Sequence, residues 1–540
     1  MSTPLLQPDA LSPSTYDVAA VSLVDGPQRP ACLQWLIENR TTPTTWGAPP
    51  QVNWYDAYLS TYAAALALYN AGHRSLAEPA LTALAALVPA APDAVLETLT
   101  FGGLVDALDR LCTHRGWPLP EHPEPVRAVM ERERAKWERM RAWDGFLDPA
   151  RSIAGYCAER VYGDQDIDTA IFLEAFQAPN GSISNAPAAS ALFLLEAERR
   201  GANAASERVE RLRRYLHTCR VPLGYLDWVP HFTTAWTVMF EHAAGTTPTP
   251  APAALDALGA DLNHPSGLLC TVSTLDGGLT IPGDSDSTAC AMLAARITGR
   301  NVPDSTHLDT LYDPSQGCYR TFLFEHDTST TTNIHVAAVL ALDGRHDRLT
   351  EVLRWLTRAV SEGRTPCKWH LSPTYPHGEL ARITAAIDHP LAAALCTEAV
   401  ETLLATQNPD GGWGRHGSTT EETAYAVHGL ATAARSHAHA YAPKTTDALG
   451  AAHTHLTTHP PRQTPLWLGK TLYSLRPLVP VLHRTATTHA EQMLSSVASG
   501  PPGGRGPALG ACGGRGMDGG LVLGAAAFDV ESGTSPSGTG

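Results

Sequence analysis

The stretch Gly278-Leu279-Thr280-Ile281-Pro282-Gly283-Asp284-Ser285-Asp286-Ser287-Thr288-Ala289 holds the chemistry around which this chain is organised. Asp284 and Asp286 stand close together, directly after a Pro-Gly break and directly before an apolar helical run. Two close carboxylates resist double ionisation, so one of them can keep a proton at neutral pH and serve as a general acid. The same cluster would also cap a helix, and for this stretch alone capping is the better explanation.

The composition indicates a folded protein of more than one domain. A chain of 540 residues exceeds one compact core, so we expect two domains. The net charge of −15, with no basic stripe to offset it, argues against nucleic acid as a partner. No run approaches eighteen apolar residues and the N-terminus lacks a signal-peptide layout, so we expect a cytoplasmic protein without stable membrane insertion. The ten cysteines show no Cys-x-x-Cys pair and no zinc-type spacing, which indicates reduced thiols.

Apolar periodicity near 3.6 residues recurs along the chain, and no convincing alternating strand is present, so the fold is predicted to be all-α. Residues 246–252 (TTPTPAP) read as a linker near the midpoint, and the Gly/Pro/Ser-rich residues 494–540 as a disordered tail. A weak internal repeat pairs Trp46-Gly47 with Trp413-Gly414, each ahead of a helix. Helices are predicted most clearly at residues 14–24, 56–69, 81–88, 94–111, 125–143, 187–200, 205–219, 234–242, 287–297, 332–342, 349–360, 391–406 and 422–433.

Two motifs together resemble the class II terpene cyclases. Gln407-Asn-Pro-Asp-Gly-Gly-Trp-Gly414 resembles the glutamine–tryptophan motif of terpene cyclases and their prenyltransferase relatives. Residues 284–289 resemble the Asp-x-Asp-Asp-Thr-Ala signature of class II cyclases, with Ser287 where the last Asp usually stands. The chain is identified as a member of the class II diterpene cyclases of the copalyl diphosphate synthase type, over roughly residues 12–480. The further matching stretches, in the family's order, are residues 16–19, 181–189, 368–373, 421–425 and 465–473.

This resemblance implies two (α/α) barrels, called β and γ. Residues 1–24 would supply the first helix of β, residues 25–249 the inserted γ barrel, and residues 250–493 the rest of β with the acid motif. The active site would lie between the barrels, since ligand pockets are common at domain interfaces.

The resemblance also implies a reaction, in which geranylgeranyl diphosphate is protonated and cyclised to a bicyclic copalyl-type, labdane-related diphosphate. Asp286 would be the general acid and Asp284 its support, while Ser287 offers a hydrogen bond but no third charge. No Asp-Asp dipeptide occurs, so the class I metal cluster is missing and the product would pass to a downstream class I diterpene synthase. The stereochemistry, ent or otherwise, stays open, as does the choice between monomer and homodimer.

Alternatives remain at this point. A squalene–hopene-like cyclase, a sesquiterpene (drimane-type) cyclase and a catalytically inactive helical-barrel scaffold fit the same motifs. A prenyltransferase β subunit is disfavoured, because no Asp/Cys/His zinc set is visible in the sequence. The acid-rich stretch 164–168 could be mistaken for the acid motif, but it lies in the γ half and is interpreted as a surface helix N-terminus.

The resemblance further implies which residues bind the substrate. Lys136 and Lys368 would hold the diphosphate, and Mg²⁺ would bind at Glu97, although the usual Glu-Asp-x-x-Asp pattern is missing there. Aromatic faces would stabilise the carbocation, with Trp413 serving mainly a structural purpose. The terminal base stays open among His231, Asn333, His335 and water. The aromatic and histidine candidates are Trp369, Tyr375, Trp413 and Tyr425 on the β side and Trp228, His231 and Trp236 on the γ side.

Overall fold

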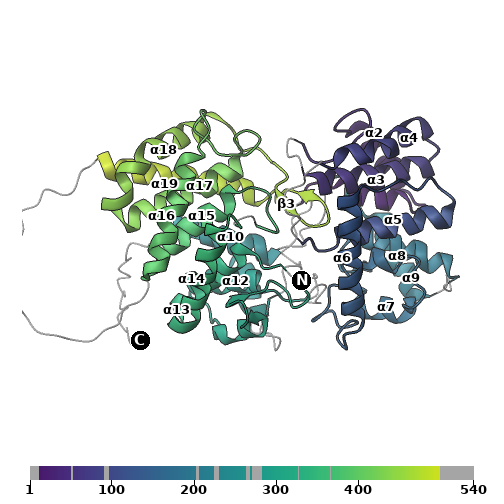
Figure 1. Cartoon of the computed structure of the whole chain (residues 1–540), viewed down its shortest axis with the longest axis horizontal. Coiled ribbons are helices and arrows are strands. Elements are labelled where there is room, and N and C mark those ends of the chain that lie inside the picture. Colours follow the sequence, from purple (N-terminus) through teal and green to yellow (C-terminus); the bar gives the residue numbers. More distant parts are fainter. Residues whose placement is uncertain are drawn as a thin grey trace, which may run out of the picture.

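The computed structural model describes residues 11–49, 53–89, 97–201, 206–223, 230–262, 268–269, 282–325, 327–364 and 367–498. Over these residues the chain forms nineteen α-helices, four short 3₁₀ turns and two antiparallel hairpins with strands of two residues. The all-α prediction is therefore confirmed. Figure 1 shows two helical bodies side by side, one of purple and blue helices and one of green and yellow helices. No helix in the described part of the chain is both long and apolar enough to cross a membrane.

The first body is built around α3 (Trp54–Asn70), whose small residues are buried on several faces because other helices surround it. Its apolar core extends from Tyr16 to Val221. The other helices of this body are α1 (Thr15–Ser22), α2 (Arg29–Glu38), α4 (Arg74–Ala83), α5 (Phe101–Arg115), α6 (Glu124–Arg141), α7 (Thr169–Phe176), α8 (Pro187–Arg199) and α9 (Glu207–Thr218), with 3₁₀ turns at Leu84–Leu87, Ala158–Val161 and Val221–Leu223.

The second body is built around α17 (Thr420–Ser436), which packs against α15, α18 and α19. Helices α15 and α17 approach closely at two glycines, since a Cβ on Gly429 would lie 2.8 Å from the Gly378 carbonyl oxygen. The other elements are α10 (Pro230–Ala243), α11 (Pro252–Leu262), α12 (Ser285–Ile297), a 3₁₀ turn (Ser305–Leu311), β1 (Tyr312–Asp313), β2 (Cys318–Tyr319), α13 (Thr330–Leu342), α14 (His346–Ser361), α15 (Thr374–Thr384), α16 (Pro390–Ala405), α18 (Ala438–Thr458), β3 (Trp467–Leu468), β4 (Leu472–Tyr473) and α19 (Leu478–Ala498).

Helix packing differs from the expected division of the chain at both ends of the inserted segment. Helix α1 was expected to belong with residues 250–493, yet it packs against α2, α3 and α8 of the first body. Conversely, α10 precedes residue 250 but packs against α12 and α19 of the second body. In both cases the apolar face of the helix finds its partners in the other core. The domain limits as such remain a prediction.

Two further boundaries change. The expected linker is a loop within the second body, because Thr249 donates from its backbone N and its Oγ1 to the Glu241 carboxylate, each at 2.7 Å. The tail was expected from residue 494, but α19 continues to Ala498. The remaining tail residues, 499–540, lie outside the described residues.

The internal repeat appears as shared hydrogen bonding. Trp46 Nε1 donates to the Leu36 carbonyl oxygen at 2.7 Å and Trp413 Nε1 to that of Leu403 at 2.8 Å, each ten residues earlier in the chain. The sequence comparison missed a related turn, in which Gln177 Nε2 donates to the Gly181 and Arg208 carbonyls. Gln407 Nε2 makes the equivalent bonds to Gly411 and Ala448. The repeated turn therefore also occurs without a tryptophan, because the glutamine hydrogen bonds at Gln177 match those at Gln407.

Candidate active site

The acid motif opens helix α12. Asp284 is the N-cap, and its Oδ1 accepts a hydrogen bond of 2.6 Å from the backbone N–H of Ser287. Gly283 precedes it where no side chain fits, since a Cβ there would lie 2.8 Å from the Leu268 carbonyl oxygen. The capping interpretation therefore holds for Asp284. Residues 278–281 of the motif lie outside the described residues.

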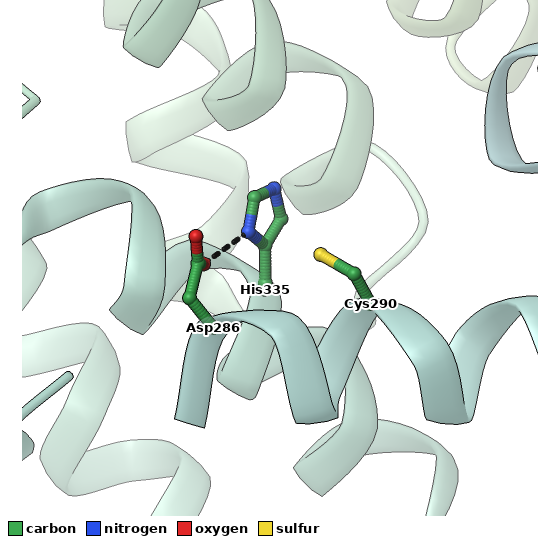
Figure 2. Close-up of side chains that lie close together, drawn as sticks. All are labelled: Asp286, Cys290 and His335. Carbon is green, nitrogen blue, oxygen red and sulfur yellow. Dashed lines mark hydrogen bonds and ion pairs between the residues drawn. The ribbon is translucent and has the colours of Figure 1, made fainter. Parts of the chain in front are cut away.

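Asp286 sits in the first turn of α12 and faces helix α13. Its Oδ1 lies 2.7 Å from His335 Nδ1, and the opposite ring nitrogen, Nε2, lies 3.1 Å from Glu379 Oε2 on α15 (Figure 2 shows the Asp286–His335 pair). Arg382, one turn further along α15, donates from Nε to Glu379 Oε1 at 3.0 Å. Four ionisable side chains from three helices thus form one buried hydrogen-bonded network.

The electrostatics of this network favour a charged His335. Burial by itself would lower the pKa of His335, but the Cys290 thiol and the Asp286 carboxylate raise that pKa well above its usual value. Burial would raise the pKa of Glu379, but Arg382 and His335 lower it to about 2. The Asp286 side chain keeps 12% of its surface exposed, while those of His335 and Glu379 keep 0% and 1%, so Asp286 is more exposed than the two side chains it leads to.

A thiol joins the acid and the imidazole. Cys290 follows Asp286 by one helical turn, and the ligand atoms of Asp286, Cys290 and His335 all lie within 4.8 Å of one another. Burial raises the pKa of the Cys290 thiol to about 12. The structure thus brings together an Asp/Cys/His group that was not visible in the sequence. Spacing could not reveal the set, since His335 follows Asp286 by 49 residues and reaches it only through helix packing.

Aromatic rings pack beside His335 and elsewhere in the same core. Trp236 meets the His335 ring edge-on at 5.5 Å and stacks on Phe232 at 3.7 Å between ring centroids. Tyr375 is fully buried, with ring centroids 4.7 Å from both His370 and Tyr425. Three polar ring atoms here have no hydrogen-bond partner among the described residues, namely Trp236 Nε1, Trp369 Nε1 and Tyr375 Oη.

Other predicted residues lie apart from this group. Trp413 is buried and bonded to the Leu403 carbonyl, which matches its expected structural purpose. His231 pairs through Nε2 with Asp261 of α11, and its helix α10 belongs to the second body, where the sequence expected the γ side. Trp228 lies outside the described residues.

Lys136 and Lys368 meet at a shared carboxylate between the two bodies. Glu97 Oε1 lies 2.9 Å from Lys136 Nζ, and Glu97 Oε2 lies 3.2 Å from Lys368 Nζ. Glu325 adds a second carboxylate, 3.0 Å from Lys368 Nζ. Burial alone would raise the pKa of Glu97, but Lys368 and Lys136 lower it to about 2. The fold thus joins the two lysines from separate bodies as a pair.

A cationic cavity of about 510 Å³ opens beside this pair. It lies between α6 and the segment that contains β1 and β2. Its lining includes three cationic side chains and one carboxylate, and two of the cations are already paired, Lys136 with Glu97 and Arg320 with Asp313. The lining residues are Lys136, Arg139, Met140, Trp143, Gln316, Arg320, Leu323, Phe324 and Glu325.

The residues around Glu97 do not fit a magnesium ion. Both Glu97 oxygens already face ammonium groups, which occupy the positions that a cation would take. Mg²⁺ prefers near-octahedral oxygen ligands, whereas each Glu97 oxygen already has an ammonium group beside it.

The acid-rich stretch in the first body is structural, as expected. Asp168 caps α7 by accepting from Ala170 N and Ile171 N, at 2.8 and 3.1 Å. Asp164 and Asp166 both pair with Arg141, and the Asp166 side chain is 78% exposed. Each of these carboxylates is thus engaged in a helix cap or in an ion pair with Arg141.

The chain is similar to curated proteins and to solved structures. No family model matches the chain. It is 27% identical to an ent-copalyl diphosphate synthase of Streptomyces sp. strain KO-3988, over 86% of this chain and 89% of that protein. It is 26% identical to a type B diterpene cyclase of Mycobacterium tuberculosis, over 86% and 93% respectively. Among solved structures, an ent-copalyl diphosphate synthase from Streptomyces platensis shares the fold with a TM-score of 0.70 and 23% identity, over 91% of this chain and 97% of that one.

The helical fold is that of a class II terpene cyclase. In sequence, the chain resembles the diterpene cyclases of the copalyl diphosphate synthase type. The expected two-barrel helical architecture is that of the matched cyclase.

Proposed function

We propose that the chain protonates the terminal alkene of geranylgeranyl diphosphate and cyclises it to a bicyclic copalyl-type diphosphate, with the diphosphate retained. The observation that carries this proposal is the Asp286–His335 pair at 2.7 Å, buried at a helix N-terminus with the ring of Trp236 against His335. The proposal also draws on the relatives, which are named as synthases of that product class.

Asp286 would be the acid. An alkene is an extremely weak base, so its protonation needs a neutral carboxylic acid held away from water. With Oδ1 facing His335, the proton would leave from the other carboxyl oxygen. The carboxylate left behind would be stabilised by the His335 N–H and by the N-terminus of α12. A hydrogen bond to a charged group contributes about 1.5–3 kcal/mol.

Asp284 and Ser287 would support this step. Asp284 holds the first turn of α12 in place through its bond to Ser287 N, which sets the position of Asp286. Ser287 is buried beside it and brings no third carboxylate. We infer that the acidity of Asp286 depends on His335 rather than on a neighbouring Asp.

The aromatic rings would shield the carbocation. Positive charge over a desolvated ring gains about 1–2 kcal/mol. Trp236, Trp369 and Tyr375 are the candidates, because each carries a buried polar atom without a partner among the described residues. Such atoms indicate a surface meant to meet a ligand or water.

Lys136 and Lys368 would bind the diphosphate at the junction of the two bodies. A diphosphate entering the cationic cavity would compete with Glu97 for the two ammonium groups. Binding of Mg²⁺ at Glu97 stays a prediction, and the two ammonium groups at Glu97 disfavour it. Product formation in excess EDTA tests this point. Complete loss of product would indicate that the reaction requires Mg²⁺.

The chemistry of the product indicates which class of enzyme acts next. A cyclic diphosphate keeps its leaving group, so a class I diterpene synthase would act downstream. The cytoplasmic location and the monomeric or homodimeric state remain predictions, which cell fractionation and light scattering test.

The deciding experiment incubates the purified chain separately with geranylgeranyl diphosphate, farnesyl diphosphate and squalene, followed by phosphatase treatment and mass spectrometry. We expect a bicyclic diterpene alcohol from the first substrate. Asp286→Asn should lower its formation at least about 10³-fold, within the range of general acid catalysis. Asp166→Asn is the matched control, since Asp166 is an exposed surface carboxylate.

Each alternative has its own outcome. Product from squalene alone would indicate a hopene-type enzyme, and product from farnesyl diphosphate alone a drimane-type enzyme. No product from any substrate would indicate a scaffold.

A further inference from the structure

We infer that Asp286, Cys290 and His335 form a binding site for a thiophilic divalent cation such as Zn²⁺, and that a bound cation switches the acid off. The inhibition rests on the proposed function, whereas the binding does not.

The three side chains converge from two helices. Asp286 and Cys290 project from the same face of α12 toward His335 of α13, as Figure 2 shows. Their ligand atoms lie within 4.8 Å of one another. One oxygen, one sulfur and one nitrogen ligand form a set that suits Zn²⁺, Co²⁺ or Cd²⁺ and leaves a fourth position open.

The surroundings of His335 are those of a metal ligand. A ligating histidine usually donates its second ring N–H to a carboxylate, which fixes the tautomer and orients the ring. Here His335 Nε2 lies 3.1 Å from Glu379 Oε2, and Arg382 holds Glu379 from the other side. Nδ1 is therefore the nitrogen that faces Asp286, as the site requires.

Charge also balances at the site. A buried cation needs compensating charge, and the Asp286 carboxylate with a Cys290 thiolate would neutralise the two positive charges. A coordinating thiol gives up its proton to the metal. Binding would therefore release the thiol proton, the Nδ1 proton of a charged His335 and any proton on Asp286 to the solvent, with no change of oxidation state.

Selectivity and consequence follow from the donor set. Mg²⁺ prefers hard oxygen ligands and would bind only weakly to a site with sulfur and imidazole ligands. A cation bound to Asp286 occupies the carboxylate that must carry the proton, so the alkene cannot be protonated. Zn²⁺ should thus inhibit the cyclase without competing for the diphosphate site.

The first test measures binding with Co²⁺ and needs no activity. Titration of the purified full-length chain should produce a near-ultraviolet thiolate-to-cobalt band that saturates at one ion per chain. Cys290→Ser should abolish this band. Cys396→Ala is the matched control, because Cys396 is a buried thiol of the same core whose Sγ lies near the Ala381 carbonyl. No band in the wild-type chain, or a band retained in Cys290→Ser, would overturn the site.

The second test measures inhibition by Zn²⁺ with geranylgeranyl diphosphate as substrate, each variant against its own metal-free rate. Cys290→Ser should raise the half-inhibitory Zn²⁺ concentration at least about tenfold, as should Glu379→Gln, in line with the 10–100-fold effect of such carboxylates. Cys396→Ala should leave it unchanged. Equal inhibition of all variants would refute the switch.

The two tests separate the possible failures. A cobalt band in a chain with no cyclase activity would leave the site standing and reject the proposed function. Circular dichroism of each variant excludes misfolding, and Cys290→Ser keeps the size of the side chain so that the helix is preserved.

Discussion

Asp286 and His335 lie 49 residues apart in the chain and share a buried contact of 2.7 Å. Their helices, α12 and α13, pack side by side, so the pair is held by the core rather than by a loop. A catalytic acid on a rigid element keeps its geometry through the reaction.

Replacing His335 by Phe should keep the volume of the ring and remove its hydrogen bond to Asp286. We expect kcat to fall about 10²–10³-fold with little change in KM, as when one preorganised donor is lost. Steady-state kinetics with geranylgeranyl diphosphate measures this. His307→Ala, on the exposed surface, should behave as wild type. An unchanged kcat in His335→Phe would show that His335 does not support the acid.

Lys368→Met should weaken substrate binding and stability together. Loss of the ammonium group should raise KM for geranylgeranyl diphosphate. It also leaves Glu97 and Glu325 without that partner, and an uncompensated buried charge costs about 3–5 kcal/mol. Urea unfolding measures the stability.

Glu97→Gln should restore part of the stability lost in Lys368→Met, and leave KM raised. The exposed Lys444→Met serves as control. Additive effects of Lys368→Met and Glu97→Gln on stability would contradict the shared ion pair.

Acid should destabilise the second body through two buried histidines. His428 of α17 and His489 of α19 face each other with their Nδ1 atoms 3.2 Å apart. Burial, Arg382 and Arg435 lower the pKa of His428 to about 3 against a smaller opposing effect of Glu379, and burial, His428 and the same arginines lower the pKa of His489 well below its usual value.

The sign follows from these directions. Both histidines stay neutral in the folded chain and take up protons when it unfolds, so stability is full above pH 6.5 and falls as the pH drops toward 3. The loss should reach about 2 kcal/mol per histidine at pH 5. Urea unfolding at pH 7.5 and pH 5 measures it, and His428→Asn should flatten the difference. An equal pH dependence in that variant would exclude His428 as the cause.

Gly429→Ala should destabilise the second body by at least about 1–3 kcal/mol, because the added Cβ would lie 2.8 Å from the Gly378 carbonyl and must separate α15 from α17. Gly450→Ala is the matched control, since its nearest neighbour would lie 4.0 Å away in the interior of α18. That substitution should stabilise by about 0.5–1 kcal/mol. Thermal unfolding measures both, and similar melting temperatures would contradict the close approach.

The prediction from sequence was strongest where the signal is local. Capping by Asp284, the helical class and the turn around Trp413 all rest on residues a few positions apart. It was weakest for α18 and α19, which were not predicted although each buries apolar residues in the second core, and for the core to which α1 belongs. An amphipathic helix exposes an apolar face to any core, so its pattern does not choose the partner.

By itself, then, the sequence determined the class of protein and the acid motif, because both are written in short stretches that keep their spacing in any fold. Only the tertiary structure decided that His335 and Cys290 stand beside Asp286, and that Lys136 and Lys368 share Glu97. These partners come from helices far apart in the chain. The free energy that joins them is released only when the apolar faces pack, so no local spacing records it.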